Sequence, residues 1–251
     1  MQPSSHPPNN SIIVIPARMD SQRLYGKPLA DICGEPMIVH VWRRAVESDV
    51  GPVLVACADK EIANAIDKIG GNAVMTRPDH VSGSDRVFEA VQAVDPDGIY
   101  NTVINLQGDL PTINSEVIAK VLRPLDALDV DIGTVACQIS DDSERDDPNV
   151  VKAVVSFTPA GTVGRALYFT RTTAPSGDGP LLHHIGLYAF RRAALQRFVT
   201  LPTAPLEARE KLEQLRALEA GMRIDVVLVD TLPLGVDTPL DLERAREILA
   251  P

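Results

Sequence analysis

Residues 11–29 read SIIVIPARMDSQRLYGKPL, a run of β-branched residues that passes directly into a basic loop. The first part, 11–16, predicts a buried strand, because the run is short and apolar and ends at a proline. From here to about residue 124, strand and helix patterns alternate. Further strands are expected at 53–58, 73–76 and 102–107, and helices from Pro36, over 60–69, from Ser84 and from Asn114 or Ser115. Such alternation predicts an α/β fold with a mainly parallel sheet flanked by helices.

The pattern changes after residue 131. Segments 132–139, 150–157, 166–170 and 183–190 are typical of strands and have no long helices between them, which indicates a smaller, antiparallel, strand-rich extension over about 131–190. A loop is expected at 172–180, a long helix at 205–220, a strand at 223–229 and a last helix capped by Thr238. The chain is therefore expected to form one domain over 11–251, preceded by a disordered segment at 1–10.

The composition limits the classes of partner. The chain has 251 residues and a net charge of −10, so nonspecific attraction to nucleic acid or to an anionic membrane is not expected. The start lacks the basic and apolar stretches of a secretory signal, and no later apolar run is long enough to insert into a membrane. Three widely spaced cysteines predict neither a disulfide framework nor a zinc ribbon. A cytoplasmic location fits best.

The basic loop is the first candidate binding element. It carries Arg18, Arg23 and Lys27 within one turn of chain, and Gly26 lets the backbone approach a ligand closely. Three cations in an acidic protein favour a polyanionic ligand such as a polyphosphate. The alternative is an ordinary solvated loop, since the spacing matches neither GxxxxGK[ST] nor GxGxxG.

Two aspartates are candidates for holding Mg²⁺. Asp109 follows the strand at 102–107, and Asp237 lies before the last helix, so both are at strand-to-helix junctions. Open α/β sheets bind ligands at the carboxyl ends of their strands, and Mg²⁺ prefers carboxylate, water and phosphate oxygens. The alternatives are a Gly-Asp turn and a structural cap, although Thr238 already suits the capping position.

A third stretch, 76–86, reads TRPDHVSGSDR and combines Arg77 and Arg86 with a Ser-Gly-Ser helix start. Backbone N–H groups at such a start can bind an anion, and an ordinary N-cap explains the pattern equally well. The pair His183-His184 does not predict a metal site, because adjacent residues on a strand point to opposite faces.

Taken together, these stretches resemble the 3-deoxy-manno-octulosonate cytidylyltransferases, also called CMP-Kdo synthetases. The resemblance covers nearly the whole chain, in the family's order: IPARMDSQRLYGKPL (15–29), MIVHVW (37–42), MTRPDHVSGSDR (75–86), NLQGDLP (105–111), HHIGLY (183–188), PLEAREKLEQLR (205–216) and LGVDTPLDLE (234–243). It implies a Rossmann-like nucleotidyltransferase fold, a homodimer formed largely through the strand-rich part, and a role in making lipopolysaccharide precursors. It also implies CTP and the acidic sugar Kdo as substrates, with Mg²⁺ as cofactor.

The resemblance assigns roles by motif position. Arg18 and Lys27 bind the CTP phosphates with help from Arg23, and Asp109 and Asp237 hold Mg²⁺. The sugar side of the cleft takes Gln107, Arg171, His184, Tyr188 and Glu213. Residues near the nucleotide are Arg77, Ser82, Gly83 and Arg86. The implied reaction is in-line attack of the anomeric hydroxyl of Kdo on the α-phosphorus of CTP, with release of pyrophosphate.

The chain departs from the family pattern at several positions. Tyr25 stands where proline is common, Leu110 where an acidic residue often follows Gly-Asp, and His183 where an arginine is sometimes found. Leu110 removes an auxiliary carboxylate, and His183 affects the sugar contacts. The remaining alternatives are a nucleotidyltransferase for another acidic sugar, such as 8-amino Kdo or a sialic-acid-like sugar, a sugar-phosphate uridylyltransferase, and a non-catalytic nucleotide-binding relative.

Overall fold

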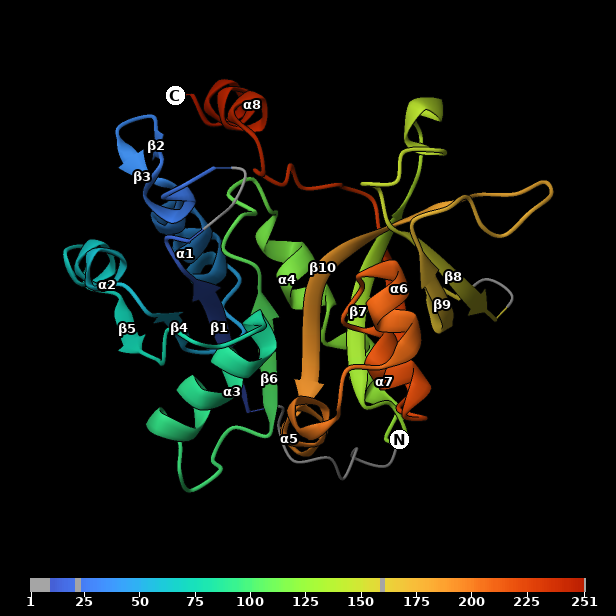
Figure 1. The fold of residues 1–251 in the computed structure, drawn as a ribbon, viewed down its shortest axis with the longest axis horizontal. Helices are drawn as coiled ribbons and strands as arrows, with labels where there is room; N and C mark the ends of the chain where they lie inside the picture. The colour runs from blue at the N-terminus through green and yellow to red at the C-terminus, as the bar shows by residue number, and fades with distance from the viewer. Residues whose placement is uncertain (1–9, 21–23, 159–160, 251) are drawn as a thin grey trace, which may run out of the picture.

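The computed structural model of the chain describes residues 10–20, 24–158 and 161–250. Within these residues one nine-stranded sheet forms the centre, in the order β5-β4-β1-β6-β10-β7-β11-β9-β8 (Figure 1). Its strands are β1 (Ser11–Ala17), β4 (Val53–Cys57), β5 (Asn72–Met75), β6 (Thr102–Leu106), β7 (Ile132–Gln138), β8 (Lys152–Phe157), β9 (Val163–Thr170), β10 (Leu182–Arg191) and β11 (Ile224–Val229). The helices are α1 (Met37–Glu47), α2 (Lys60–Asp67), α3 (Gly83–Val94), α4 (Ser115–Lys120), α5 (Arg192–Thr200), α6 (Pro205–Glu210), α7 (Leu215–Glu219) and α8 (Pro239–Leu249).

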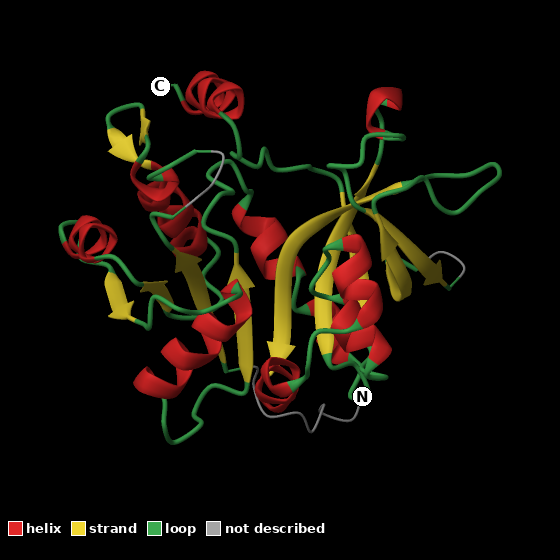
Figure 2. Cartoon of the chain, in the orientation of Figure 1, coloured by secondary structure: helices red, strands yellow, loops and turns green. Residues whose placement is uncertain are grey.

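Helices cover both faces of this sheet (Figure 2). Because side chains alternate along a strand, those of β1 contribute to two hydrophobic cores, one on each face of the sheet. Ile13 and Ile15 pack with residues of α1, α2 and α4, whereas Ile12 and Val14 pack with residues of α3, α5 and α7. Burial on both faces explains why this strand is a continuous apolar run in the sequence.

The sheet is mixed, and the expected parallel arrangement holds only in part. Strands β5, β4, β1 and β6 are parallel, as the alternating pattern predicts. Beyond β6, β10 runs antiparallel to both of its neighbours, β7 and β11 are parallel, and β9 and β8 are antiparallel. Strands β7 and β10 therefore lie inside the main sheet, and only β8 and β9 lie beyond β11, at the end of the sheet opposite β5. The strands of the segment 131–190 therefore belong to the same sheet as the first half of the chain.

The helix expected over 205–220 is two helices. Lys211 has a φ of 57°, a left-handed conformation that ends α6 before α7 begins. Arg216 of α7 then donates to Glu207 of α6, with Nε 2.8 Å from Oε2. This ion pair joins the two helices across the break.

Other element boundaries differ in smaller ways. The N-cap of α3 is Ser82, whose hydroxyl accepts from the Asp85 backbone N–H, so the expected cap at Ser84 is wrong by two residues. The cap of α8 is Thr238, as expected. Helix α5 was not expected, because no capping side chain marks its start.

The expected disordered segment lies outside the described residues except for Asn10, which accepts backbone hydrogen bonds from Asn101 and Thr102. None of the described helices could cross a bilayer.

Asp95 connects the end of α3 to the start of α5. Its buried carboxylate accepts from the backbone N–H groups of Ile99 (2.8 Å) and Tyr100 (2.9 Å) and from the Arg192 guanidinium. Burial alone would raise the pKa of Asp95, but these hydrogen bonds outweigh it and lower the pKa. The carboxylate therefore stabilises the fold above its unfolded pKa of about 3.9, and this contribution is lost as the pH falls below that value.

Asp95→Ala is expected to lower the free energy of unfolding by about 3 kcal/mol at pH 7, because it leaves Arg192 and two backbone donors without their acceptor. Urea unfolding at pH 7 measures this loss. At pH 3 the difference from the unmodified chain is expected to shrink. The exposed Asp97→Ala is the matched control, and an equal loss in both variants would contradict the assignment.

Candidate active site

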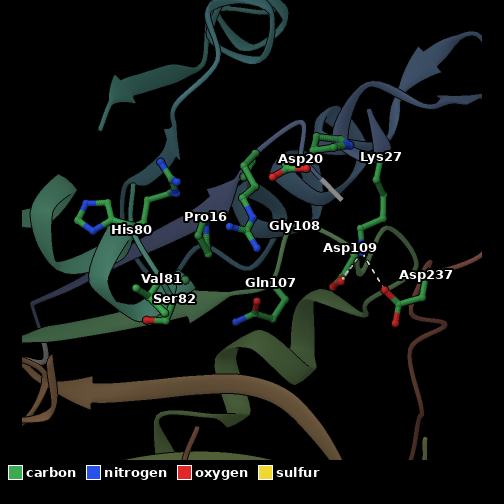
Figure 3. Close-up of a pocket in the computed structure, with 15 residues that line it drawn as sticks. Pro16, Asp20, Lys27, His80, Val81, Ser82, Gln107, Gly108, Asp109 and Asp237 are labelled. Carbon is green, nitrogen blue, oxygen red and sulfur yellow. Dashed lines mark hydrogen bonds and ion pairs between the residues drawn. The ribbon is translucent and has the colours of Figure 1, made fainter. Parts of the chain in front are cut away.

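A cleft of about 420 Å³ opens at the carboxyl ends of β1 and β6 (Figure 3). Open α/β sheets commonly bind ligands at this edge. The cleft is formed by the end of β1 and its basic loop, the turn after β6, the start of α3 and the segment before α8. Its lining includes eight of the predicted site residues: Arg18, Lys27, Ser82, Gly83, Arg86, Gln107, Asp109 and Asp237.

Backbone contacts bring the two predicted metal ligands together. The Val236 N–H donates to the Asp109 carbonyl at 2.9 Å, so Asp237 lies beside the turn that follows β6. The Leu234 N–H donates to Thr112 Oγ1 at 2.8 Å and fastens the same two segments a second time. Asp109 and Asp237 are 128 positions apart in the sequence (237 − 109) and meet through these bonds.

Lys27 lies between the two carboxylates. Its ammonium is 2.8 Å from Asp109 Oδ2 and 3.0 Å from Asp237 Oδ1, as the dashed lines in Figure 3 mark. Burial alone would lower the pKa of Lys27, but the two carboxylates outweigh it and raise the pKa. Lys27 is therefore charged at neutral pH. It starts a short 3-10 turn, η1 (Lys27–Leu29), after Gly26, whose φ of 69° favours glycine.

The donor set fits Mg²⁺. Two carboxylates that converge on one cation are hard oxygen ligands, and Mg²⁺ typically takes one or two protein carboxylates together with substrate phosphates. Within the described part of the chain, no group of three or more His, Cys, Asp or Glu side chains is arranged for a metal. Asp109 and Asp237, which share the Lys27 ammonium, are the two predicted metal ligands that line this cleft.

Arg86 is a buried cation that lines the same cleft. Only 2% of Arg86 is exposed, and its guanidinium donates to Thr76 Oγ1 and to the Arg77 carbonyl. Among the ion pairs of the described residues, none includes Arg86. Burial and the nearby Arg18 lower its pKa, in that order of importance. An anion between these two arginines would relieve their repulsion.

The cleft is also lined by residues that were not predicted, among them Asp20, His80 and Val81. His80 contacts the Glu89 carboxylate, which also accepts from the Arg77 backbone N–H at 3.2 Å. These contacts hold the segment that leads into α3. The sequence contained a signal for His80, since it lies between two predicted residues, Arg77 and Ser82.

The remaining predicted residues that the structure describes do not line this cleft. Arg77 borders a neighbouring groove and lies 3.6 Å from Glu89, and Arg23 is outside the described residues. The Arg171 side chain donates to the carbonyls of Glu210 and Pro148, both at 2.8 Å. His184 is buried beside Thr134 Oγ1 at 3.0 Å. Burial and His183 lower its pKa to about 3, so His184 is neutral at physiological pH.

Tyr188 and Glu213 face a small internal cavity behind the first turn of α3. Glu213 Oε2 accepts from Ser84 Oγ at 2.9 Å, whereas Oε1 is buried and has no hydrogen-bond partner among the described residues. Burial raises the pKa of Glu213. Gly83 lines the large cleft and the next residue, Ser84, lines the small cavity, so both spaces adjoin the first turn of α3. A buried acceptor without a donor suits a ligand hydroxyl.

Comparison with known proteins identifies the family. A sequence model described as cytidylyltransferase matches residues 12–224. The 3-deoxy-manno-octulosonate cytidylyltransferase of Rhodospirillum centenum is 63% identical over 244 residues, which cover 97% of this chain and 95% of the relative. That of Paramagnetospirillum magneticum is 61% identical over 238 residues, covering 95% and 97%. The chain belongs to the 3-deoxy-manno-octulosonate cytidylyltransferase family.

Solved structures agree with this assignment. A CMP:2-keto-3-deoxy-manno-octonic acid synthetase complexed with CTP superimposes with a TM-score of 0.88 at 40% identity, over 96% of this chain and 98% of that one. A cytidylyltransferase from Leptospira borgpetersenii has a TM-score of 0.60 at 14% identity, over 94% and 85%, and is similar in fold alone. The α/β nucleotidyltransferase fold expected for a 3-deoxy-manno-octulosonate cytidylyltransferase is therefore confirmed.

Proposed function

We propose that this chain transfers CMP from CTP to the anomeric hydroxyl of Kdo, giving CMP-Kdo and pyrophosphate for lipopolysaccharide biosynthesis. The observation that carries the proposal is the cleft in which Asp109 and Asp237 face one cation while Arg18 and Arg86 line the same space. A site with two metal-binding carboxylates and two arginines suits a triphosphate. Its relatives carry the name of this activity.

Different residues of the cleft are proposed to bind the phosphates and the metal. Arg18, Lys27 and Arg86 bind and orient the CTP phosphates and offset the charge that develops on their oxygens. Mg²⁺ held by Asp109 and Asp237 would supply Lewis-acid stabilisation of the phosphates and lower the pKa of a coordinated hydroxyl. Positioning both substrates makes the attack effectively intramolecular, and no covalent enzyme intermediate is needed.

The sugar end of the site is proposed to lie beside Gln107 and to reach the small cavity of Tyr188 and Glu213. Glu213 Oε1 offers an acceptor to a sugar hydroxyl, since it is buried and no donor among the described residues meets it. Gln107 lines the cleft, and its Nε2 donates to Asn105 Oδ1 at 3.2 Å. Arg171 and His184 complete this end, with Arg171 serving the sugar carboxylate.

Assembly and location are part of the same proposal. Residues 11–251 act as one domain, and two copies meet through the strand-rich part at about 131–190. The end of the sheet formed by β9 and the edge strand β8 supports this arrangement, because Leu167 of β9 is 57% exposed. Neither nucleic acid nor a membrane is a partner, in keeping with the net charge of −10. The three free cysteines fit the cytoplasm.

The direct test is pyrophosphate release from CTP with Mg²⁺ and Kdo. The sugar panel contains Kdo, 8-amino Kdo and a sialic acid, and the nucleotide panel contains CTP and UTP. Release with CTP and Kdo is the expected result. Faster turnover of another sugar would reassign the substrate, and CTP binding without turnover would indicate a nucleotide-binding protein.

Arg171→Ala and His184→Ala are each expected to raise the Kdo concentration needed for half-maximal rate by about tenfold or more, because each removes a polar partner of the sugar. CTP binding is expected to stay nearly unchanged. Calorimetric titration with CTP and steady-state pyrophosphate release measure the two quantities separately. Normal use of Kdo by both variants, or an equal loss of CTP binding, would place the sugar elsewhere.

A further inference from the structure

The ammonium of Lys27 occupies the space that both candidate metal ligands face. It lies within 3.0 Å of one oxygen of Asp109 and one of Asp237, and 13% of its side chain is exposed. The Lys27 ammonium is therefore paired with both carboxylates, and this arrangement links two segments that are far apart in the chain. No other described cation is paired with both carboxylates.

We propose that Lys27 couples metal binding to nucleotide binding. In the free protein its ammonium holds Asp109 and Asp237 together and opposes entry of a divalent cation. When a nucleotide enters, the ammonium leaves the carboxylates for the phosphates, and the carboxylates become available to the metal. This inference rests on the proposed metal-binding role of the two aspartates.

Electrostatics makes the two cations competitors. An ammonium and a divalent ion that share the same carboxylate oxygens repel each other at contact distance, and partial burial weakens the screening by water. The free protein is therefore expected to bind a divalent cation weakly although two carboxylates converge. Replacing Lys27 by a neutral residue removes the repulsion and vacates the position between the two carboxylates.

A nucleotide gives Lys27 an alternative partner in the same cleft. Lysine presents its charge on a flexible four-carbon stem, so the ammonium can change partners while η1 stays in place. Arg18 and Arg86 line this space as well and have no carboxylate partner among the described residues. They would hold the phosphates within the cleft that Lys27 also lines. The phosphate charge then replaces the carboxylate charge beside the ammonium.

Thermodynamic linkage makes the proposal measurable without turnover. If the nucleotide strengthens metal binding by moving Lys27, the metal must strengthen nucleotide binding by the same factor. A variant without the ammonium should bind the metal more tightly in the free protein. It should also lose the part of the coupling that Lys27 provides.

The experiment measures Mn²⁺ binding to the full chain by electron paramagnetic resonance, with no substrate present. Lys27→Met is expected to bind Mn²⁺ at least about tenfold more tightly than the unmodified chain. Lys27→Gln, which keeps a polar side chain, is expected to do the same and covers the case in which the Met variant fails to fold. Lys68→Met is the matched control, because Lys68 is exposed at the end of α2 and its loss changes the net charge equally.

A second arm adds CMP, whose single phosphate competes only weakly for Mn²⁺. CMP is expected to tighten Mn²⁺ binding by at least about fivefold in the unmodified chain and to have little effect in Lys27→Met. Equal Mn²⁺ affinity in the unmodified chain and both Lys27 variants would overturn the proposal, and so would equal tightening by CMP. Adding Asp109→Asn to Lys27→Met, in which Mn²⁺ is expected to bind more tightly, distinguishes a failure of this proposal from a failure of the proposed metal site. If the added substitution leaves Mn²⁺ binding unchanged, the proposed metal site itself is wrong.

Discussion

Asp109→Asn and Asp237→Asn are each expected to lower turnover of CTP and Kdo by at least about 100-fold while the chain stays folded. Loss of a partner that only orients a metal ligand typically costs up to about 100-fold, so loss of a ligand should cost no less. Each substitution also leaves Lys27 with one carboxylate in place of two. The asparagine side chain has nearly the same shape, so packing at the turn after β6 and before α8 is expected to persist.

Single-turnover pyrophosphate release at saturating CTP measures this effect, and circular dichroism checks the fold. Asp230→Asn is the matched control, because Asp230 is an exposed carboxylate in the same connection between β11 and α8. It is expected to keep full activity. Activity within a few-fold of normal in Asp109→Asn or Asp237→Asn would remove that residue from the metal site.

The sequence predicted the first half of the fold better than the second. Ile12 to Ile15 of β1 are buried in alternation against two cores, and such a run is recognisable as a strand without knowledge of its neighbours. The insertion of β10 between β6 and β7 was not predictable in this way. The sequence pattern of a strand does not show which strand it pairs with. The register from Leu187 to Arg191 against β6 depends on tertiary packing.

The break between α6 and α7 shows a second limit. Residues 205–220 have the composition of one continuous helix, and propensity alone predicts one. In the structure Lys211 adopts a left-handed conformation, and the Glu207–Arg216 ion pair forms across the break. Tertiary contacts thus outweigh a local preference worth less than about 1 kcal/mol per residue.

The convergence of Asp109 and Asp237 was more predictable from the sequence than the positions of Arg171 and His184. Asp109 and Asp237 follow strands whose carboxyl ends share one edge of the sheet, so general topology already favours their meeting. The bond from Val236 that joins them is not visible in the sequence. Arg171 and His184 were assigned by resemblance alone, and in the structure their side chains contact Glu210, Pro148 and Thr134.

Arg86→Met is expected to weaken CTP binding by about 10- to 100-fold, the range that corresponds to losing one charge-assisted hydrogen bond to a phosphate. The same substitution is expected to change the free energy of unfolding much less than a typical buried truncation. Methionine fills much of the volume of the arginine stem, and it removes a buried cation that has only neutral acceptors.

The two effects together distinguish a binding role from a structural one. A buried arginine kept only for packing would show the reverse pattern, with a large loss of stability and CTP affinity unchanged in the folded fraction. Calorimetric titration with CTP and urea unfolding of the same preparation give both numbers. Arg44→Met is the matched control for loss of one positive charge, because the half-buried Arg44 pairs with Glu47 on α1. If Arg86→Met binds CTP as tightly as Arg44→Met does, no phosphate lies against this guanidinium, and the buried charge beside Arg18 needs another anion to explain it.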